Sequence, residues 1–103
     1  MTFRLLYVIC KDEREAIRIS DELLAHRLAA CVNRFPVISE YLNEGTIEKS
    51  KEMALLVKTT SAKVKRATAR IREIHSYDVP CVLTLSSVKA NKEFATWVTQ
   101  SLQ

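Results

Sequence analysis

The stretch at residues 28–59 reads LAACVNRFPVISEYLNEGTIEKSKEMALLVKT, and it decides the fold. β-Branched and aromatic residues are frequent on both sides of Asn43, Glu44 and Gly45, which predicts two strands joined in a long hairpin. Gly45 is the only glycine of the chain, and it stands where a tight turn favours positive φ. The second arm, residues 45–59, far exceeds the usual strand of about 5–6 residues. A domain this small cannot cover such an arm alone, so we expect neighbouring copies to close its free edge.

Length and composition predict a single compact domain spanning residues 1–103. The chain is 48% hydrophobic and has one glycine and two prolines, which leaves no flexible linker. No run approaches the roughly 20 apolar residues of a membrane-spanning helix, and the first residues lead into a strand pattern rather than a signal peptide. The three cysteines, an odd number without CxxC spacing, disfavour disulfides and a self-contained zinc site. We therefore expect a cytoplasmic protein with reduced thiols and no membrane segment.

The net charge of +4 is concentrated in a predicted helix that begins at Ser61. Its basic residues outnumber the acidic Glu73, and they are Lys63, Lys65, Arg66, Arg70 and Arg72. Neither interleaved aromatic side chains nor an RNA-binding motif accompanies them. We interpret this helix face as solvated surface and expect no nucleic-acid binding.

The segments around the hairpin complete a recognisable order. Residues 3–10 form a nearly unbroken apolar run, typical of a central strand. Asp12, with Glu15 three residues later, marks the start of a helix with one apolar face. The hairpin is followed by the helix from Ser61, a strand at 79–85 and a terminal helix at 91–102. The predicted elements thus follow the ferredoxin-like βαββαβ order of an α+β protein, with an additional helix at the C-terminus.

This order predicts an antiparallel sheet with strands arranged 4-1-3-2. Pro36 cannot donate a ladder hydrogen bond, so the first hairpin arm should lie at the edge. The first strand then ends where the fourth begins. This brings Cys10 near His75 and Tyr77, which directly precede the fourth strand. Lys58 ends the third strand at the opposite edge. Thiolate and imidazole suit Cu(I) or Zn(II), with a third ligand from water or another subunit. The structural alternatives are a buried Cys10 that packs as a small hydrophobe and a His75 that opposes the helix dipole.

Several motifs follow one another in a specific order: LAACVN at 28–33, SEYLNEG at 39–45, ALLVKT at 54–59, HSYDVP at 75–80, and Trp97. In order and spacing they resemble the CutA family, the divalent-cation tolerance proteins, over essentially the whole chain. The resemblance implies a tight homotrimer joined through the long hairpins, similar in outline to the PII signalling proteins. It also implies an association with copper and no catalysis, so we expect no enzyme. Ile74 stands where members with a proposed copper site carry a second histidine beside His75.

Three classes of function remain open from the sequence. The first is a homotrimeric divalent-cation tolerance protein that binds copper or another divalent metal through Cys10 and His75. The second is a PII-like sensor that binds a small anionic ligand in a cleft between subunits. The third is a structural trimer that presents a surface to a partner. The candidate residues for the ligand cleft are Lys58, with Lys11 as the nearer alternative, together with Tyr77, Trp97 and Glu44.

Overall fold

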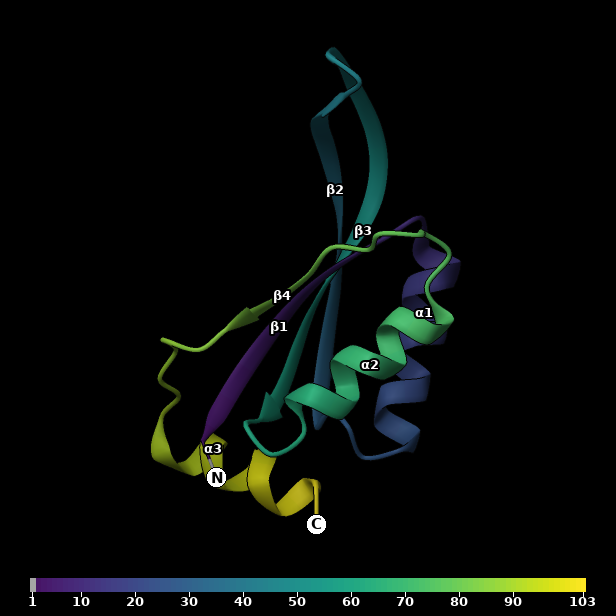
Figure 1. Ribbon diagram of the computed structural model, residues 1–103. Helices are drawn as coiled ribbons and strands as arrows, with labels where there is room; N and C mark the ends of the chain where they lie inside the picture. Colours follow the sequence, from purple (N-terminus) through teal and green to yellow (C-terminus); the bar gives the residue numbers. More distant parts are fainter. Residues whose placement is uncertain (1) are drawn as a thin grey trace.

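The computed structural model describes residues 2–103 and contains four strands and three helices (Figure 1). In chain order these are β1 (Phe3–Cys10), α1 (Glu13–Ala25), β2 (Cys31–Asn43), β3 (Thr46–Thr60), α2 (Val64–Ile74), β4 (Val82–Leu85) and α3 (Lys92–Ser101). The predicted α+β order with its C-terminal helix is confirmed.

Two predicted boundaries are wrong by about three residues. The helix expected from Ser61 begins at Val64, because residues 61–63 form a turn and the Ser61 hydroxyl accepts a hydrogen bond from the Thr2 amide at 3.2 Å instead of capping the helix. The strand expected from residue 79 begins at Val82. Pro80 has no N–H to donate to a ladder, which favours the later start.

The sheet has the predicted antiparallel order, β2-β3-β1-β4, with Pro36 on the edge strand β2. The expectation for the long arm needs a correction, because β2 pairs with β3 from Thr46 to Lys58 and therefore accompanies the whole ribbon. β1 pairs with β3 only from Met53 onward. Residues 46–52 of β3 thus have a neighbour on one side only, and the ribbon projects beyond the body of the molecule (Figure 1). The molecule is correspondingly elongated, 45 × 25 × 21 Å.

The hairpin turns where the sequence predicts. Asn43 pairs with Thr46, which leaves Glu44 and Gly45 as the two loop residues. Both have positive φ, 52° for Glu44 and 82° for Gly45, as a type I′ turn requires. This turn has the right twist for a long two-stranded ribbon, so it holds the two arms in register.

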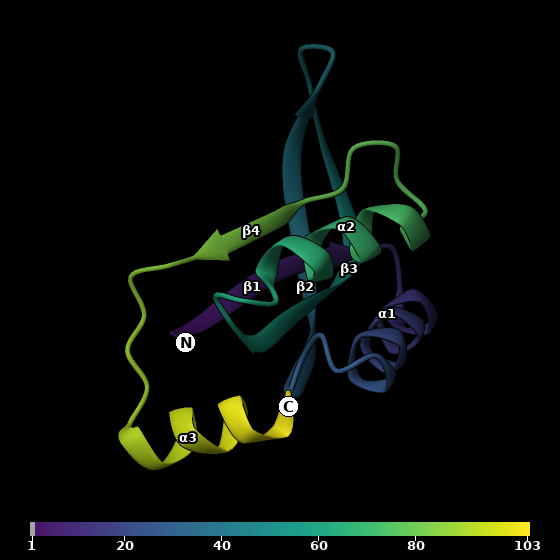
Figure 2. The same ribbon diagram turned by 60° about the horizontal axis from the view of Figure 1, so that its bottom comes forward.

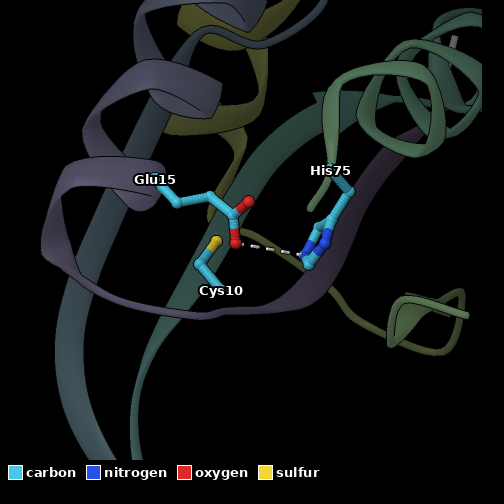
Figure 3. Close-up of side chains that lie close together, drawn as sticks. All are labelled: Cys10, Glu15 and His75. Atoms are coloured by element: carbon cyan, nitrogen blue, oxygen red, sulfur yellow. Dashed lines mark ion pairs between the residues drawn. The ribbon is translucent and has the colours of Figure 1, made fainter. Parts of the chain in front are cut away.

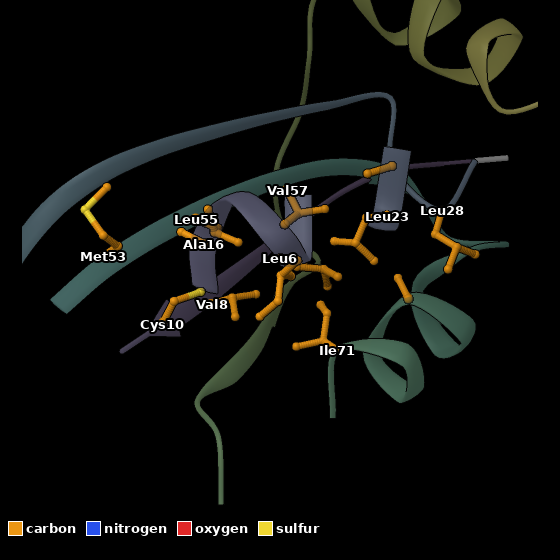
Figure 4. Close-up of a cluster of buried hydrophobic side chains, with 13 residues drawn as sticks. Leu6, Val8, Cys10, Ala16, Leu23, Leu28, Met53, Leu55, Val57 and Ile71 are labelled. Carbon is orange, nitrogen blue, oxygen red and sulfur yellow. The ribbon is translucent and has the colours of Figure 1, made fainter. Parts of the chain in front are cut away.

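The hydrophobic core lies between one face of the sheet and helices α1 and α2 (Figure 4). Every second residue of β1 and β3 points into it, and the two helices contribute the stripe that their periodicity predicts. The central members are Leu6, Val8, Cys10, Met53, Leu55, Val57, Ala16, Ile19, Leu23, Ala67 and Ile71. Burying each of the larger side chains stabilises the fold by about 1.5–3 kcal/mol.

The other face of the sheet, here called the open face, is also apolar. Its residues alternate with those of the core, and α3 contacts it at β3 and β1, where Phe94 packs edge-on against Phe3. Figure 2 shows α3 set apart from α1 and α2. Away from α3 the open face carries Tyr7, Ile9, Leu56, Leu83 and Leu85, none of which is fully buried. Within residues 2–103, no helix combines the length and apolar character that crossing a bilayer demands.

Candidate functional site

Cys10, Glu15 and His75 meet at one buried junction (Figure 3). Cys10 ends β1, Glu15 lies in the first turn of α1, and His75 follows α2 directly. Their sulfur, oxygen and nitrogen atoms all lie within 4.8 Å of one another. The structure thus places Cys10 and His75 together at the predicted edge of the sheet, and it adds Glu15, which the sequence analysis treated only as part of a helix cap.

Glu15 joins three segments of the chain through its carboxylate. Oε1 accepts a hydrogen bond from the Lys11 amide at 2.8 Å, and Oε2 accepts one from the Ser76 amide at 2.8 Å and one from Arg18 at 3.3 Å. Asp12 caps the helix as predicted, since its Oδ1 accepts from the Glu15 amide at 2.9 Å. Burial acts to raise the pKa of Glu15, but the hydrogen bonds from Lys11 and Ser76 outweigh it, so the pKa lies below its ordinary value. The carboxylate is therefore charged although only 3% of the side chain is exposed.

The imidazole of His75 uses both of its nitrogens. Nδ1 accepts a hydrogen bond from the Tyr77 amide at 3.1 Å, so the ring proton is on Nε2, which donates to the carbonyl oxygen of Ile9 at 2.7 Å. Nε2 also approaches Oε1 of Glu15 at 3.8 Å, the dashed line of Figure 3. His75 is the C-cap residue of α2, so it ends the helix as the structural alternative expected, and its ring is turned toward the end of β1.

Cys10 belongs to the core and to the junction at once. Its side chain is completely buried beside Val8 and Met53, as expected for a small hydrophobe. Burial, together with the carboxylates of Glu15 and Asp12, raises the pKa of Cys10 to about 12. The thiol is therefore protonated, and a cation that binds the sulfur must displace this proton.

Tyr77 connects the junction to the hairpin. Its hydroxyl donates to Oε2 of Glu52 at 2.6 Å, and its ring lies 4.9 Å from that of His75, centroid to centroid. Glu52 is the residue of β3 immediately before the strand meets β1, at the base of the projecting ribbon. Burial and the hydrogen bond to Glu52 raise the pKa of Tyr77. Residues 75–77 are thus bonded to β1, to α1 and to the ribbon.

The other predicted cleft residues lie elsewhere. Nζ of Lys58 is 3.9 Å from Sγ of Cys31 and 5.5 Å from the centre of the Phe94 ring. The ring of Trp97 lies tilted beside that of Phe94, with the ring centres 5.6 Å apart. Lys58 pairs with Leu5 and Phe94 packs against Phe3, both near the start of β1. Tyr77 lies near the end of β1, roughly 16–23 Å away along the strand. Within one protomer Tyr77 and Trp97 therefore lie apart, and a cleft between copies that they share stays a prediction.

Glu44, the remaining cleft candidate, is exposed in the hairpin turn, and Lys11 contributes its backbone amide to Glu15. Whether a neighbouring copy carries Lys58 or Glu44 to Tyr77 stays a prediction. The sequence marks Glu15 as part of a helix cap but not as a partner of His75 or Ser76, and it does not distinguish Glu52 from other glutamates, because these partners come from distant segments.

Comparison with known proteins identifies the family. The family model described as CutA1 divalent ion tolerance protein matches residues 4–101. The chain belongs to the CutA1 family. The divalent-cation tolerance protein CutA of Archaeoglobus fulgidus is 37% identical over 98 residues, which cover 95% of this chain and 96% of that protein. The family resemblance predicted from the motifs is confirmed.

Solved CutA structures confirm the fold. One from A. fulgidus, described as a periplasmic divalent cation tolerance protein, superposes with a TM-score of 0.95 at 35% identity and covers 99% of this chain and 100% of its own. CutA1 from Ehrlichia chaffeensis gives 0.94 at 37% identity and covers 99% and 96%. These CutA proteins are named for tolerance of ions rather than for a reaction, and the absence of enzymatic activity here stays a prediction. Because one relative is described as periplasmic, the cytoplasmic location stays a prediction as well.

Proposed function

We propose that this chain is a homotrimeric cation-tolerance protein of the cytoplasm that binds copper or another thiophilic divalent metal at Cys10, Glu15 and His75. The observation that carries the proposal is the convergence of three different donor atoms within 4.8 Å at a buried point. Thiolate and imidazole are preferred ligands of copper and zinc, and a carboxylate completes a common set. Three free cysteines suit a reducing compartment.

The donor atoms of the three residues are of a type that such an ion binds, and they lie close enough together to share one. Each residue already has a proton or hydrogen-bond partners that the ion would displace. Cys10 carries a proton, His75 uses both nitrogens, and Glu15 accepts three hydrogen bonds. The free energy of metal binding is therefore reduced by the free energy lost when these hydrogen bonds and the thiol proton are displaced. We expect a moderate metal affinity. Because the side chains of Glu15 and His75 are 3% and 0% exposed, a bound ion would be held away from solvent, which suits sequestration rather than catalysis.

The trimer is supported by apolar surface and by free strand edges. On the open face Leu83 and Leu85 are 51% and 40% exposed, and on the ribbon Ile38, Leu42 and Ile47 are 66–76% exposed. An isolated chain would leave this surface in water and an unpaired edge along residues 46–52, both of which favour association. A closed ring removes both, and the family resemblance indicates a ring of three.

The metal site is tested by titrating the reduced protein with Cu(I) and, separately, with Zn(II). The wild type should bind one ion per chain, and Cys10→Ser should lose binding, because a hydroxyl is a poor ligand for a soft metal. Cys81→Ser is the matched control, since Cys81 is also a free cysteine but lies outside the junction. Equal binding by wild type and Cys10→Ser would place the ion elsewhere.

The assembly is tested by sedimentation equilibrium at micromolar concentration. We expect three times the chain mass of 11.8 kDa. Leu83→Lys, which puts a charge on the open face, should weaken the trimer, whereas Lys65→Glu on the exposed side of α2 should not. A wild type that sediments with the mass of one chain would overturn the assembly proposal.

A further inference from the structure

We infer that Tyr77 couples metal binding at the junction to the hairpin: ligation of His75 takes away the acceptor of the Tyr77 amide, and the resulting shift loosens the bond between Tyr77 and Glu52. The inference rests on the proposed metal site and adds a response at the surface of the protein. It follows from the hydrogen bonds of one imidazole ring and one phenol.

First, the ring of His75 cannot bind a metal ion and keep its hydrogen bond from the Tyr77 amide. A neutral imidazole has one nitrogen with a proton and one with a free lone pair. In His75 the lone pair of Nδ1 accepts the hydrogen bond from the Tyr77 amide. If a metal ion binds Nδ1, it takes that lone pair. If the ion binds Nε2, the ring proton moves to Nδ1, which then points a donor at another donor. With either nitrogen, the Tyr77 amide loses its acceptor.

The second step concerns the contacts of Tyr77. A partly buried amide without an acceptor is unfavourable, so the backbone at Tyr77 is driven to a new position. The ring of the same residue lies tilted against that of His75, with the ring centres 4.9 Å apart, and its hydroxyl holds Glu52 through a 2.6 Å hydrogen bond. A bond this short tolerates little displacement, so a shift of the Tyr77 backbone is passed on to Glu52.

Third, Glu52 lies where a change in its contacts alters the hairpin. It pairs with Val37 at the base of the ribbon, where the two strands leave the body of the protein. A shallow hollow of about 520 Å³ opens at the same place, lined by Pro36, Val37, Ile38, Lys51 and Glu52. Release of Glu52 from Tyr77 frees a carboxylate beside this apolar hollow and next to Lys51. Occupancy of a buried site thereby releases a carboxylate and changes the shape of the ribbon base, the part of the hairpin nearest the junction.

The coupling is tested with Zn²⁺ as the probe, by recording amide NMR spectra of the ¹⁵N-labelled full chain in its native assembly during a titration. In the wild type, Zn²⁺ should shift the amides of residues 75–77 and also those of Lys51 and Glu52. In Tyr77→Phe, residues 75–77 should still respond while the ribbon base does not. The variant should bind Zn²⁺ about tenfold more tightly, because the metal-free form no longer has the Glu52 bond to give up.

Two further variants make the result specific. Tyr41→Phe removes a hydroxyl from the ribbon that makes no bond to Glu52, and it should behave as the wild type does. Glu52→Ala removes the acceptor and leaves Tyr77 in place, so it should reproduce the tighter binding if Tyr77→Phe folds poorly. Zn²⁺ binding that depends on Cys10 but leaves the ribbon amides and the affinity of both variants unchanged would overturn the coupling and leave the proposed metal site intact. A wild type that binds no Zn²⁺ would overturn both.

Discussion

The substitution Glu15→Gln measures how much the buried junction stabilises the fold. The two side chains have nearly the same shape, but glutamine replaces one carboxylate oxygen by an NH₂ group. In the native protein each oxygen accepts a backbone amide at 2.8 Å, from Lys11 on one side and from Ser76 on the other. Whichever way the new amide turns, its NH₂ faces one of these N–H groups, so one hydrogen bond is lost and the other acceptor is no longer charged.

The size of the effect follows from these bonds. A hydrogen bond to a charged group contributes about 1.5–3 kcal/mol net, against about 1 kcal/mol for a neutral pair, so losing one and weakening the other costs about 2–4 kcal/mol. Glu15 is 3% exposed, so water cannot replace the lost partner. The loss is a large part of the roughly 5–15 kcal/mol by which domains are stable.

Glu13→Gln is the matched control. Glu13 lies in the same first turn of α1, so both substitutions remove the same favourable interaction with the helix dipole, about 0.3–1 kcal/mol. Glu13 is 67% exposed, and its one polar side-chain contact within residues 2–103 is a long one to Arg34, at 3.8 Å. Urea unfolding followed by circular dichroism, at one fixed chain concentration because assembly adds to stability, compares the two variants. If Glu15→Gln loses no more stability than Glu13→Gln, the hydrogen bonds from Lys11 and Ser76 to Glu15 do not stabilise the fold.

Two further predictions concern buried hydroxyls and a surface ion pair. Thr59→Val should lower the free energy of unfolding by about 1–3 kcal/mol, because Oγ1 of Thr59 donates to the Leu28 carbonyl at 2.8 Å. Thr60→Val should leave it unchanged or raise it, because the buried Oγ1 of Thr60 has no partner among the described residues. Urea unfolding of the two variants measures the difference. The pKa of Glu22 lies below its ordinary value because Arg70 donates hydrogen bonds to it, so its stabilising contribution is present above pH 4.5 and is lost as the pH falls through the lower folded-state pKa. The loss of stability between pH 5 and pH 3 should therefore be smaller in Glu22→Gln than in the wild type, and equal losses would contradict the assignment.

The strand order and the hairpin were predictable because they depend on local signals. One glycine set the turn, Pro36 marked an edge strand, and the right-handed crossover rule left a single sheet order. The error at the start of α2 arose where a distant segment supplied the partner. Ser61 has the residue type of a helix cap, but its hydroxyl bonds the Thr2 amide across 59 positions, and α2 starts later as a result.

For the junction, the sequence by itself determined that Cys10 and His75 come together, because strand order places the end of β1 beside the end of α2. It did not determine what surrounds them. One oxygen of Glu15 satisfies local amide geometry, as a cap does, but the other binds Ser76, which is 61 positions away. Likewise the Tyr77–Glu52 bond exists only because the sheet places the base of the ribbon beside the loop after α2. Periodicity and turn chemistry act over a few residues, so the sequence shows them directly. Which polar groups meet at a junction depends on distances set by packed helices and strands, and only the tertiary structure decides those.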